Sequence, residues 1–133
     1  MSLYDQSMPQ YAKMLRNMER WLDKAEAHAA AKKFDVNVLL AARLEPDQFP
    51  LVRQIQAACD AAKSGAAHLA GLPLPKHPDV ETTFPEIRAR IKTVLDFLAT
   101  VDRASIDGQE ARPVTLAFMP GKVIDATDYL HEL

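Results

Sequence analysis

The sequence predicts an all-α fold, a four-helix bundle with a crossover connection, and three observations support this prediction. Apolar residues recur at steps of three and four through three long segments, which is the spacing of one face of a helix. A length of 133 residues with 48% hydrophobic and 26% charged content fits a single soluble domain, residues 1–133. Two connecting segments, 71–82 and 103–123, are long enough to run the length of a helix, which argues against a simple up-down-up-down order.

Composition and charge exclude several classes of function. The formal net charge of -2 gives no basic excess of the kind that binds nucleic acid. No run of about 18 apolar residues could span a membrane. The first ten residues lack the charged-then-apolar order of a signal peptide, so we expect a cytoplasmic protein. The single cysteine, Cys59, excludes an internal disulfide and a cysteine-based zinc site and is expected to be a small buried residue.

The first helix is predicted to begin at a capping box. Ser7 is followed three residues later by Gln10, and Pro9 would stand in the first turn, where its missing N–H is harmless. The apolar face then carries Met8, Tyr11, Leu15, Met18, Leu22, Ala25 and Ala29. A flanking stripe at steps of seven widens this face: Met14, Trp21 and His28. The combined face is broad enough to need more than one packing partner.

The middle of the chain predicts a short helix and then a long one. Asp35 is expected to cap a short helix over 36–40. The long second helix is predicted from about Pro46 to Leu69, with Gly71 as its terminator. Its core stripe is Leu51, Ile55, Cys59, Ala62, Ala66 and Leu69. Many residues of this helix are small, so a neighbouring helix can approach it closely.

An extended crossing is predicted before the third helix. Residues 71–82 hold Pro73, Pro75 and Pro78, which favour an ordered extended path. The third helix is predicted to begin at a second capping box, Thr83 with Glu86, and to run to about Val101. Its core face carries Phe84, Ile87, Ile91, Val94, Leu98 and Val101. Its charged residues are expected to face solvent: Arg88, Arg90 and Lys92.

A strand-like hairpin and a short final helix are predicted at the end of the chain. Alternating apolar residues place the hairpin near 112–123, ending at Pro120-Gly121. A last helix is predicted over roughly 125–133, which spans only ~13 Å against ~35 Å for the first helix. The last helix is therefore truncated within residues 1–133. Either the chain is truncated, or the hairpin segment or a partner subunit covers the gap.

Three stretches resemble a known family. These are LYDQSMPQY at 3–11, RLEPDQFPLVRQI at 43–55 and DVETTFPEIRARI at 79–91. They are similar to an uncharacterised domain-of-unknown-function family in the superfamily of DinB-like (YfiT-like) four-helix bundles, over essentially the whole chain. The resemblance implies a four-helix bundle with a crossover connection, often dimeric, in a superfamily of candidate metalloenzymes.

The resemblance also implies where a divalent metal would bind. Some relatives use a three-histidine centre, with one ligand from the second helix and two from the last, and a subset are thiol-dependent S-transferases. Here no histidine stands near the start of the second helix, where Asp47 and Gln54 occur instead, so that centre cannot be carried over. No pair among the four histidines has the i, i+4 spacing of two ligands on one helical face. His131 is the weak candidate ligand, because it alone lies where the relatives place a ligand helix.

Arg43, Asp47 and Gln54 form the strongest polar constellation. Asp47 and Gln54 are seven residues apart, so on a helix they share a core-flanking stripe with Leu51. A structural interpretation pairs Arg43 with Asp47, or lets Asp47 cap the second helix. A functional interpretation is a small polar pocket in which Asp47 serves as an oxygen ligand or general base and Trp21 forms one wall.

Three functions remain open from the sequence. The first is a small-ligand binding or interaction module without an intact three-histidine site. The second is a metal-dependent hydrolase or transferase with oxygen ligands near Asp47 and the last helix. The third is a structural homodimer in which the broad apolar face of the first helix meets a second subunit. The lack of a histidine pair favours the first and third, so the expected partners are a small molecule and a second copy, with no nucleic acid and no membrane.

Overall fold

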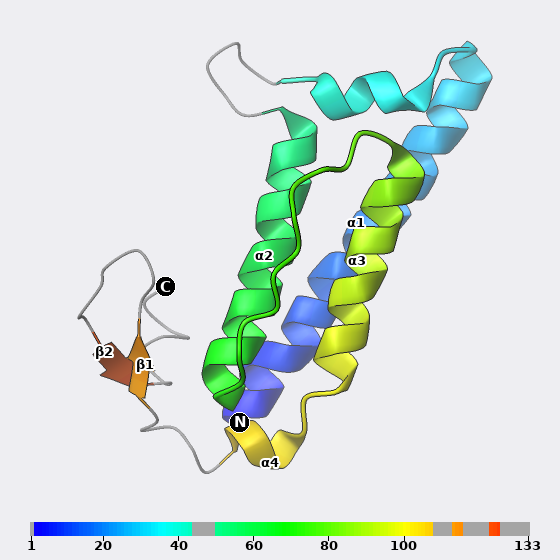
Figure 1. The fold of residues 1–133 in the computed structure, drawn as a ribbon. Coiled ribbons are helices and arrows are strands. Elements are labelled where there is room, and N and C mark those ends of the chain that lie inside the picture. The colour runs from blue at the N-terminus through cyan, green and yellow to red at the C-terminus, as the bar shows by residue number, and fades with distance from the viewer. Residues whose placement is uncertain (1, 44–49, 108–112, 116–122, 126–133) are drawn as a thin grey trace.

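The structure, a computed structural model, describes residues 2–43, 50–107, 113–115 and 123–125. Its elements are α1 (Leu3–Lys32), the 3-10 helix η1 (Val36–Ala41), α2 (Leu51–Ala70), α3 (Phe84–Ala99), α4 (Arg103–Ile106), β1 (Pro113–Thr115) and β2 (Val123–Asp125). The helices α1, α2 and α3 pack side by side, and short helices close the two ends (Figure 1). The predicted helical bundle is confirmed. Within these ranges no helix combines the length and apolar character needed to cross a membrane.

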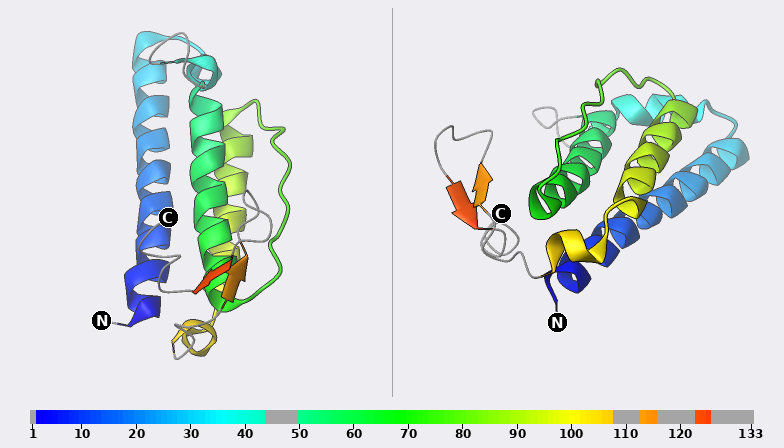
Figure 2. Two further views of the ribbon diagram at one scale, coloured as in Figure 1. Left: turned by 90° about the vertical axis from the view of Figure 1, so that its left-hand side faces the viewer. Right: turned by 60° about the horizontal axis from the view of Figure 1, so that its bottom comes forward.

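Residues 72–82, which we term the crossing segment, set the topology. Gly71 ends α2 in the left-handed conformation, with φ 68°, and its N–H donates to carbonyls of the last turn. The crossing segment then runs back along the bundle to the start of α3 (Figures 1 and 2). As a result α2 and α3 are parallel and α1 is antiparallel to both. The predicted crossover is confirmed, and its prolines suit this extended path.

The start of α1 differs from the prediction. Ser2 is the N-cap, and its hydroxyl oxygen accepts a hydrogen bond from the N–H of Asp5 at 3.1 Å. Ser7 lies inside the helix, fully buried, and its hydroxyl donates to the carbonyl of Leu3 at 2.8 Å. The predicted cap at Ser7 is therefore wrong, and Pro9 stands within the helix. The core face is confirmed, since its central residues are buried: Met8, Leu15, Leu22 and Ala29.

The start of α2 also differs from the prediction. Pro50 is the N-cap and the helix begins at Leu51, later than the predicted Pro46. A proline disfavours helical backbone in the residue before it, so Pro50 favours a start on its C-terminal side. Asp47 therefore precedes α2 and lies outside the described residues. The core stripe is confirmed, with buried side chains at Ile55, Cys59, Ala62, Ala66 and Leu69.

Close approach between α1 and α2 is built on Gly65. A Cβ atom at this position would lie 2.6 Å from Cζ of Tyr11, well inside contact distance. The ring of Tyr11 thus occupies the space that any side chain at Gly65 would fill. The expectation that small residues of α2 admit a close neighbour is confirmed at this position.

Both predicted caps near the start of α3 form. The hydroxyl of Thr83 accepts from the N–H of Glu86 at 3.4 Å and donates to its carboxylate at 2.9 Å. Asp35 caps η1 by accepting from the N–H of Asn37 at 3.0 Å. The side chain of Asn37 in turn accepts from the N–H of Phe84 at 2.7 Å, which joins η1 to the first turn of α3.

The other end of the bundle is closed by α4, which the sequence did not predict. Arg103 pairs with Asp5 of α1 at 2.7 Å, and its guanidinium lies 4.5 Å from the centre of the Tyr4 ring. Asp107 accepts from the N–H of Tyr4 at 3.0 Å. Ile106 is fully buried beneath these polar contacts. The start of α1 and the end of the described bundle are therefore tied together.

A hairpin forms near the predicted position, but its second strand, Val123–Asp125, extends past the predicted end at residue 123. β1 and β2 pair antiparallel, with Val114 opposite Ile124. The second strand extends to Asp125, so the predicted final helix cannot begin at that residue. Residues 126–133, which include His131 and the rest of that helix, lie outside the described part of the chain, as does the Pro120-Gly121 turn.

Candidate functional site

The predicted polar constellation is spread over separate places. Arg43 is exposed and lines a hollow of about 280 Å³ between η1, the start of α2 and the crossing segment. Gln54 lies on the exposed side of α2 rather than on a core-flanking stripe, whereas Gln56 is buried. Trp21 lines a different hollow on α1. The structure thus brings Trp21 and Arg43 to different hollows, and Asp47 falls outside the described residues.

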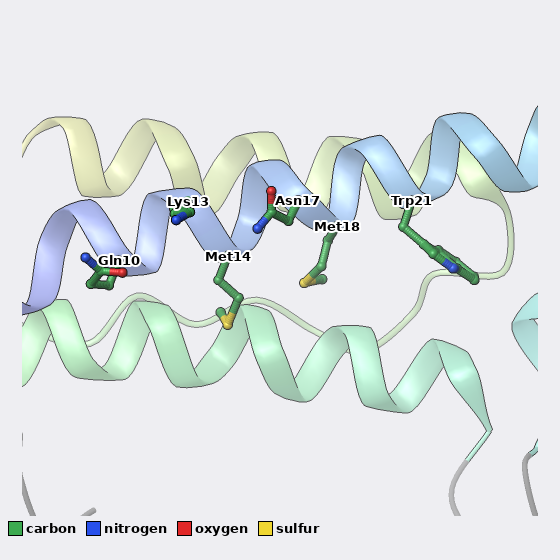
Figure 3. Close-up of a pocket in the computed structure, with 6 residues that line it drawn as sticks. All are labelled: Gln10, Lys13, Met14, Asn17, Met18 and Trp21. Atoms are coloured by element: carbon green, nitrogen blue, oxygen red, sulfur yellow. The ribbon is translucent and has the colours of Figure 1, made fainter.

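An exposed strip of α1, which we term the α1 groove, surrounds a hollow of about 490 Å³ (Figure 3). It is lined by Gln10, Lys13, Met14, Asn17, Met18 and Trp21. The side chains of Met14 and Met18 extend toward α2, and Trp21 lies level with the N-terminal end of α2. Met14 is 36% exposed and Trp21 is 43% exposed. These residues belong to the flanking stripe that was predicted to need a second packing partner, and both are open to solvent.

The α1 groove combines an apolar body with a few polar groups. Methionine side chains adapt their shape to a ligand, and an indole offers a flat face for stacking. Lys13 supplies a positive charge, and the Asn17 side chain accepts from Arg20 at 3.0 Å. Small-molecule sites have this composition, with apolar walls and a few polar groups that orient the ligand. The arrangement suits a flat or flexible apolar molecule that carries an acidic group.

A second polar feature, which we term the buried charge cluster, joins α2, α3 and the crossing segment. It consists of Asp60, Lys63, His77, Asp79, Glu81 and Arg90. The side chain of Arg90 is only 4% exposed and bridges three carboxylates, at 2.7 Å to Asp60, 2.6 Å to Asp79 and 2.7 Å to Glu81. It also donates to the carbonyl of Pro78 at 3.2 Å. The prediction that Arg90 faces solvent is wrong.

Electrostatics keep Arg90 charged despite its burial. Burial alone would lower the pKa of Arg90, but the hydrogen bonds that its guanidinium donates to Glu81, Asp79 and Asp60 outweigh burial and raise that pKa. Nε of Arg90 is buried and has no hydrogen-bond partner among the described residues. The guanidinium of Arg90 is therefore a buried positive charge that the surrounding carboxylates stabilise.

Lys63 forms the second half of the cluster. Its side chain is 5% exposed, and its ammonium lies 3.2 Å from Asp60 and 3.4 Å from Nδ1 of His77. An ammonium can only donate, so this contact is a hydrogen bond for the neutral tautomer of His77 that carries its proton on Nε2. Burial, followed by the charges of Lys63 and Arg90, lowers the pKa of His77. The neutral form of His77 is therefore the one that fits this site.

Cys59 lies beside the cluster as a buried thiol. It is fully buried, as predicted. Burial raises the pKa of the Cys59 thiol to about 11, with smaller effects from Arg90, Asp60, Glu81 and Lys63. A thiol of this pKa stays protonated at neutral pH and is a poor nucleophile.

The buried charge cluster does have a signal in the sequence, although the solvent-facing prediction for Arg90 overlooked it. Arg90 follows Ile87 by three residues and precedes Val94 by four, so it occupies a core position of α3. Lys63 stands four residues after Cys59 and has the same relation to the core stripe of α2. A charged residue at a core position predicts a partner of opposite charge, but the sequence does not identify which carboxylate is that partner.

The three-histidine centre of the relatives has no counterpart in the described residues. Within 2–43, 50–107 and the two short strands, no group of three His, Cys, Asp or Glu side chains is arranged to hold a metal ion. Asp47 and His131, the two metal candidates from the sequence, both lie outside the described ranges.

Comparisons with known proteins agree with the resemblance. The sequence profile described as "Domain of unknown function (DUF1993)" matches residues 3–133. The crystal structure of a DinB family member protein from Shewanella denitrificans is similar, with 42% sequence identity and a TM-score of 0.90. That alignment covers 98% of this chain and 74% of the Shewanella chain. No curated protein matches the chain.

Proposed function

We propose, from the premise that this chain belongs to the DUF1993 family and has the fold of a DinB-like helical protein, that it binds a small molecule in the α1 groove. The observation that carries the proposal is the exposure of Trp21 and Met14 on one side of α1, around a hollow of about 490 Å³. Single exposed apolar residues are ordinary on a protein surface. Two large ones beside Met18, grouped around one hollow, favour a binding surface.

The polar groups of the α1 groove indicate the class of ligand. Lys13 is exposed and has no acidic residue among its neighbours along the groove lining, which otherwise holds amides, thioethers and the indole. A carboxylate or sulfonate on the ligand would therefore meet a positive charge. We expect an apolar acid, with its body against Met14, Met18 and Trp21.

Replacing Trp21 by alanine is expected to weaken binding of the apolar sulfonate dye anilinonaphthalene sulfonate by about tenfold or more, because the largest wall of the α1 groove is lost. The dissociation constant is measured by titrating the dye and following its fluorescence. Leu74→Ala is the matched control, since Leu74 is also exposed but lies on the crossing segment. Equal affinity for Trp21→Ala and the unaltered protein would rule out the α1 groove as the site.

A homodimer is the second candidate, because the same exposed apolar strip could be covered by a second copy. The α1 strip exposes Met14 and Trp21, and two copies related by a two-fold axis would bury these residues of each. This candidate predicts a dimer in light scattering at micromolar concentration, and Met14→Glu should dissociate it because each copy would bring a carboxylate into the apolar interface. A monomer at that concentration contradicts this candidate and leaves the ligand site standing.

A further inference from the structure

The crossing segment is held to the bundle mainly by side chains. Before it, the N–H of Leu72 donates to the carbonyl of Ala67, and after it the N–H of Ile87 donates to the carbonyl of Thr83. Between the described residues, no backbone–backbone hydrogen bond attaches residues 73–79 to a helix. The cations of the buried charge cluster supply the attachment instead, Lys63 from α2 and Arg90 from α3.

The two attachments respond differently to pH. Arg90 keeps its charge at any pH at which a protein is folded. His77 is the member of the cluster that changes charge between about pH 5 and 8. The contact between Lys63 and His77 is therefore the attachment that mild acid can alter.

We propose that the contact between Lys63 and His77 is an acid-sensitive latch, and that protonation of His77 releases the middle of the crossing segment from α2. A protonated ring loses its acceptor at Nδ1, so the hydrogen bond from Lys63 is lost. The new charge would also stand close to the ammonium of Lys63, 3.4 Å away in the neutral form. The positive charges of Lys63 and Arg90 then repel the protonated ring, whereas they do not repel the neutral ring.

The acidic groups around His77 are already engaged. Asp60 on α2 accepts from both Lys63 and Arg90. On the crossing segment, the carboxylates of Asp79 and Glu81 accept from Arg90. Glu86 on α3 lines the same hollow as His77 and accepts from the hydroxyls of Thr82 and Thr83. A new imidazolium would have to compete for these acceptors, so they do not remove the repulsion.

The direction of the pH effect follows from linkage. In the closed form the pKa of His77 is lowered below 6.5 by burial first and then by Lys63 and Arg90. In the open form the ring returns to an ordinary pKa of ~6.5, so the open form binds the proton more tightly. The latch is therefore fully closed above about pH 6.5 and weakens as the pH falls below that value, toward the lowered pKa of the closed form.

Cys59 provides a probe for the opening. It is the single cysteine, fully buried, and its thiol senses the charges of Arg90, Asp60, Glu81 and Lys63. The rate at which a pyridyl disulfide reagent labels Cys59 is measured from about pH 7.5 to about pH 5.5 and divided by the rate for free N-acetylcysteine at each pH. Cys59 precedes Lys63 by four residues and so shares its face of α2, which opening uncovers. Linkage therefore predicts a rise of this ratio by up to about tenfold over that range.

The matched variant is His77→Gln, whose amide can accept from Lys63 at every pH. Its corrected labelling rate is expected to stay constant, whereas His68→Gln, on α2, should keep the rise of the unaltered protein. A flat rate in the unaltered protein, or an equal rise in His77→Gln, would overturn the latch.

If His77→Gln loses its helical circular dichroism, Lys63→Met replaces it as the test variant. The rise should then shrink because the opposing ammonium is gone, and an undiminished rise also overturns the proposal.

Discussion

Replacing Arg90 by methionine is expected to lower the free energy of unfolding by about 3–5 kcal/mol, because a buried charge then loses its partner. Glu81, whose side chain is 8% exposed, would be left without the guanidinium that lies 2.7 Å away. Asp60 and Asp79 are more exposed and can be hydrated, so Glu81 carries most of the loss. Urea denaturation followed by circular dichroism measures the change.

The matched control for this prediction is Arg88→Met on the same helix. Arg88 pairs with Asp23 at 2.7 Å and with Glu26 at 2.9 Å, but both carboxylates are on the surface. Exposed ion pairs contribute roughly 0–1 kcal/mol, so Arg88→Met should have a small effect. Equal losses for the two variants would mean that the buried charge cluster contributes no more than a surface ion pair.

Replacing Leu15 by alanine is expected to lower the free energy of unfolding by about 2–5 kcal/mol, because it opens a cavity in a close-packed core. Leu15 is fully buried on the inner face of α1. The neighbouring variant Met14→Ala serves as control, since Met14 is 36% exposed and borders the α1 groove. Denaturation should separate the two variants clearly, and comparable losses would contradict the division of α1 into a core face and an open face.

Core positions could be predicted from the sequence because they depend on local periodicity. The steps of three and four that place Leu15 and Ile91 on inner faces are properties of a single helix. The cap at Thr83 is equally local, since Glu86 stands three residues away. Helix starts were harder to predict where the same signal occurs twice. Ser2 and Ser7 both offer a capping hydroxyl near the start of α1, and the helix begins after Ser2.

The candidate site was less predictable because it depends on how the segments meet. Trp21 was predicted as a wall of a pocket around Asp47, which lies outside the described residues. Trp21 lines a hollow on α1, and Arg43 lines another. The three carboxylates around Arg90 come from α2 and from the crossing segment. Periodicity and capping are local signals, so they do not indicate which residues of the crossing segment lie beside Arg90.

The prolines of the crossing segment also affect the unfolded chain. Each proline fixes its own φ near about −65° and restricts the residue before it, so residues 72–82 sample fewer conformations before folding. The parallel pairing of α2 with α3 needs a long connection, and closing a long loop normally loses much chain entropy. Here part of that freedom is already absent from the denatured ensemble. The return path is therefore ordered at a smaller entropy loss than a glycine-rich connection of the same length would require.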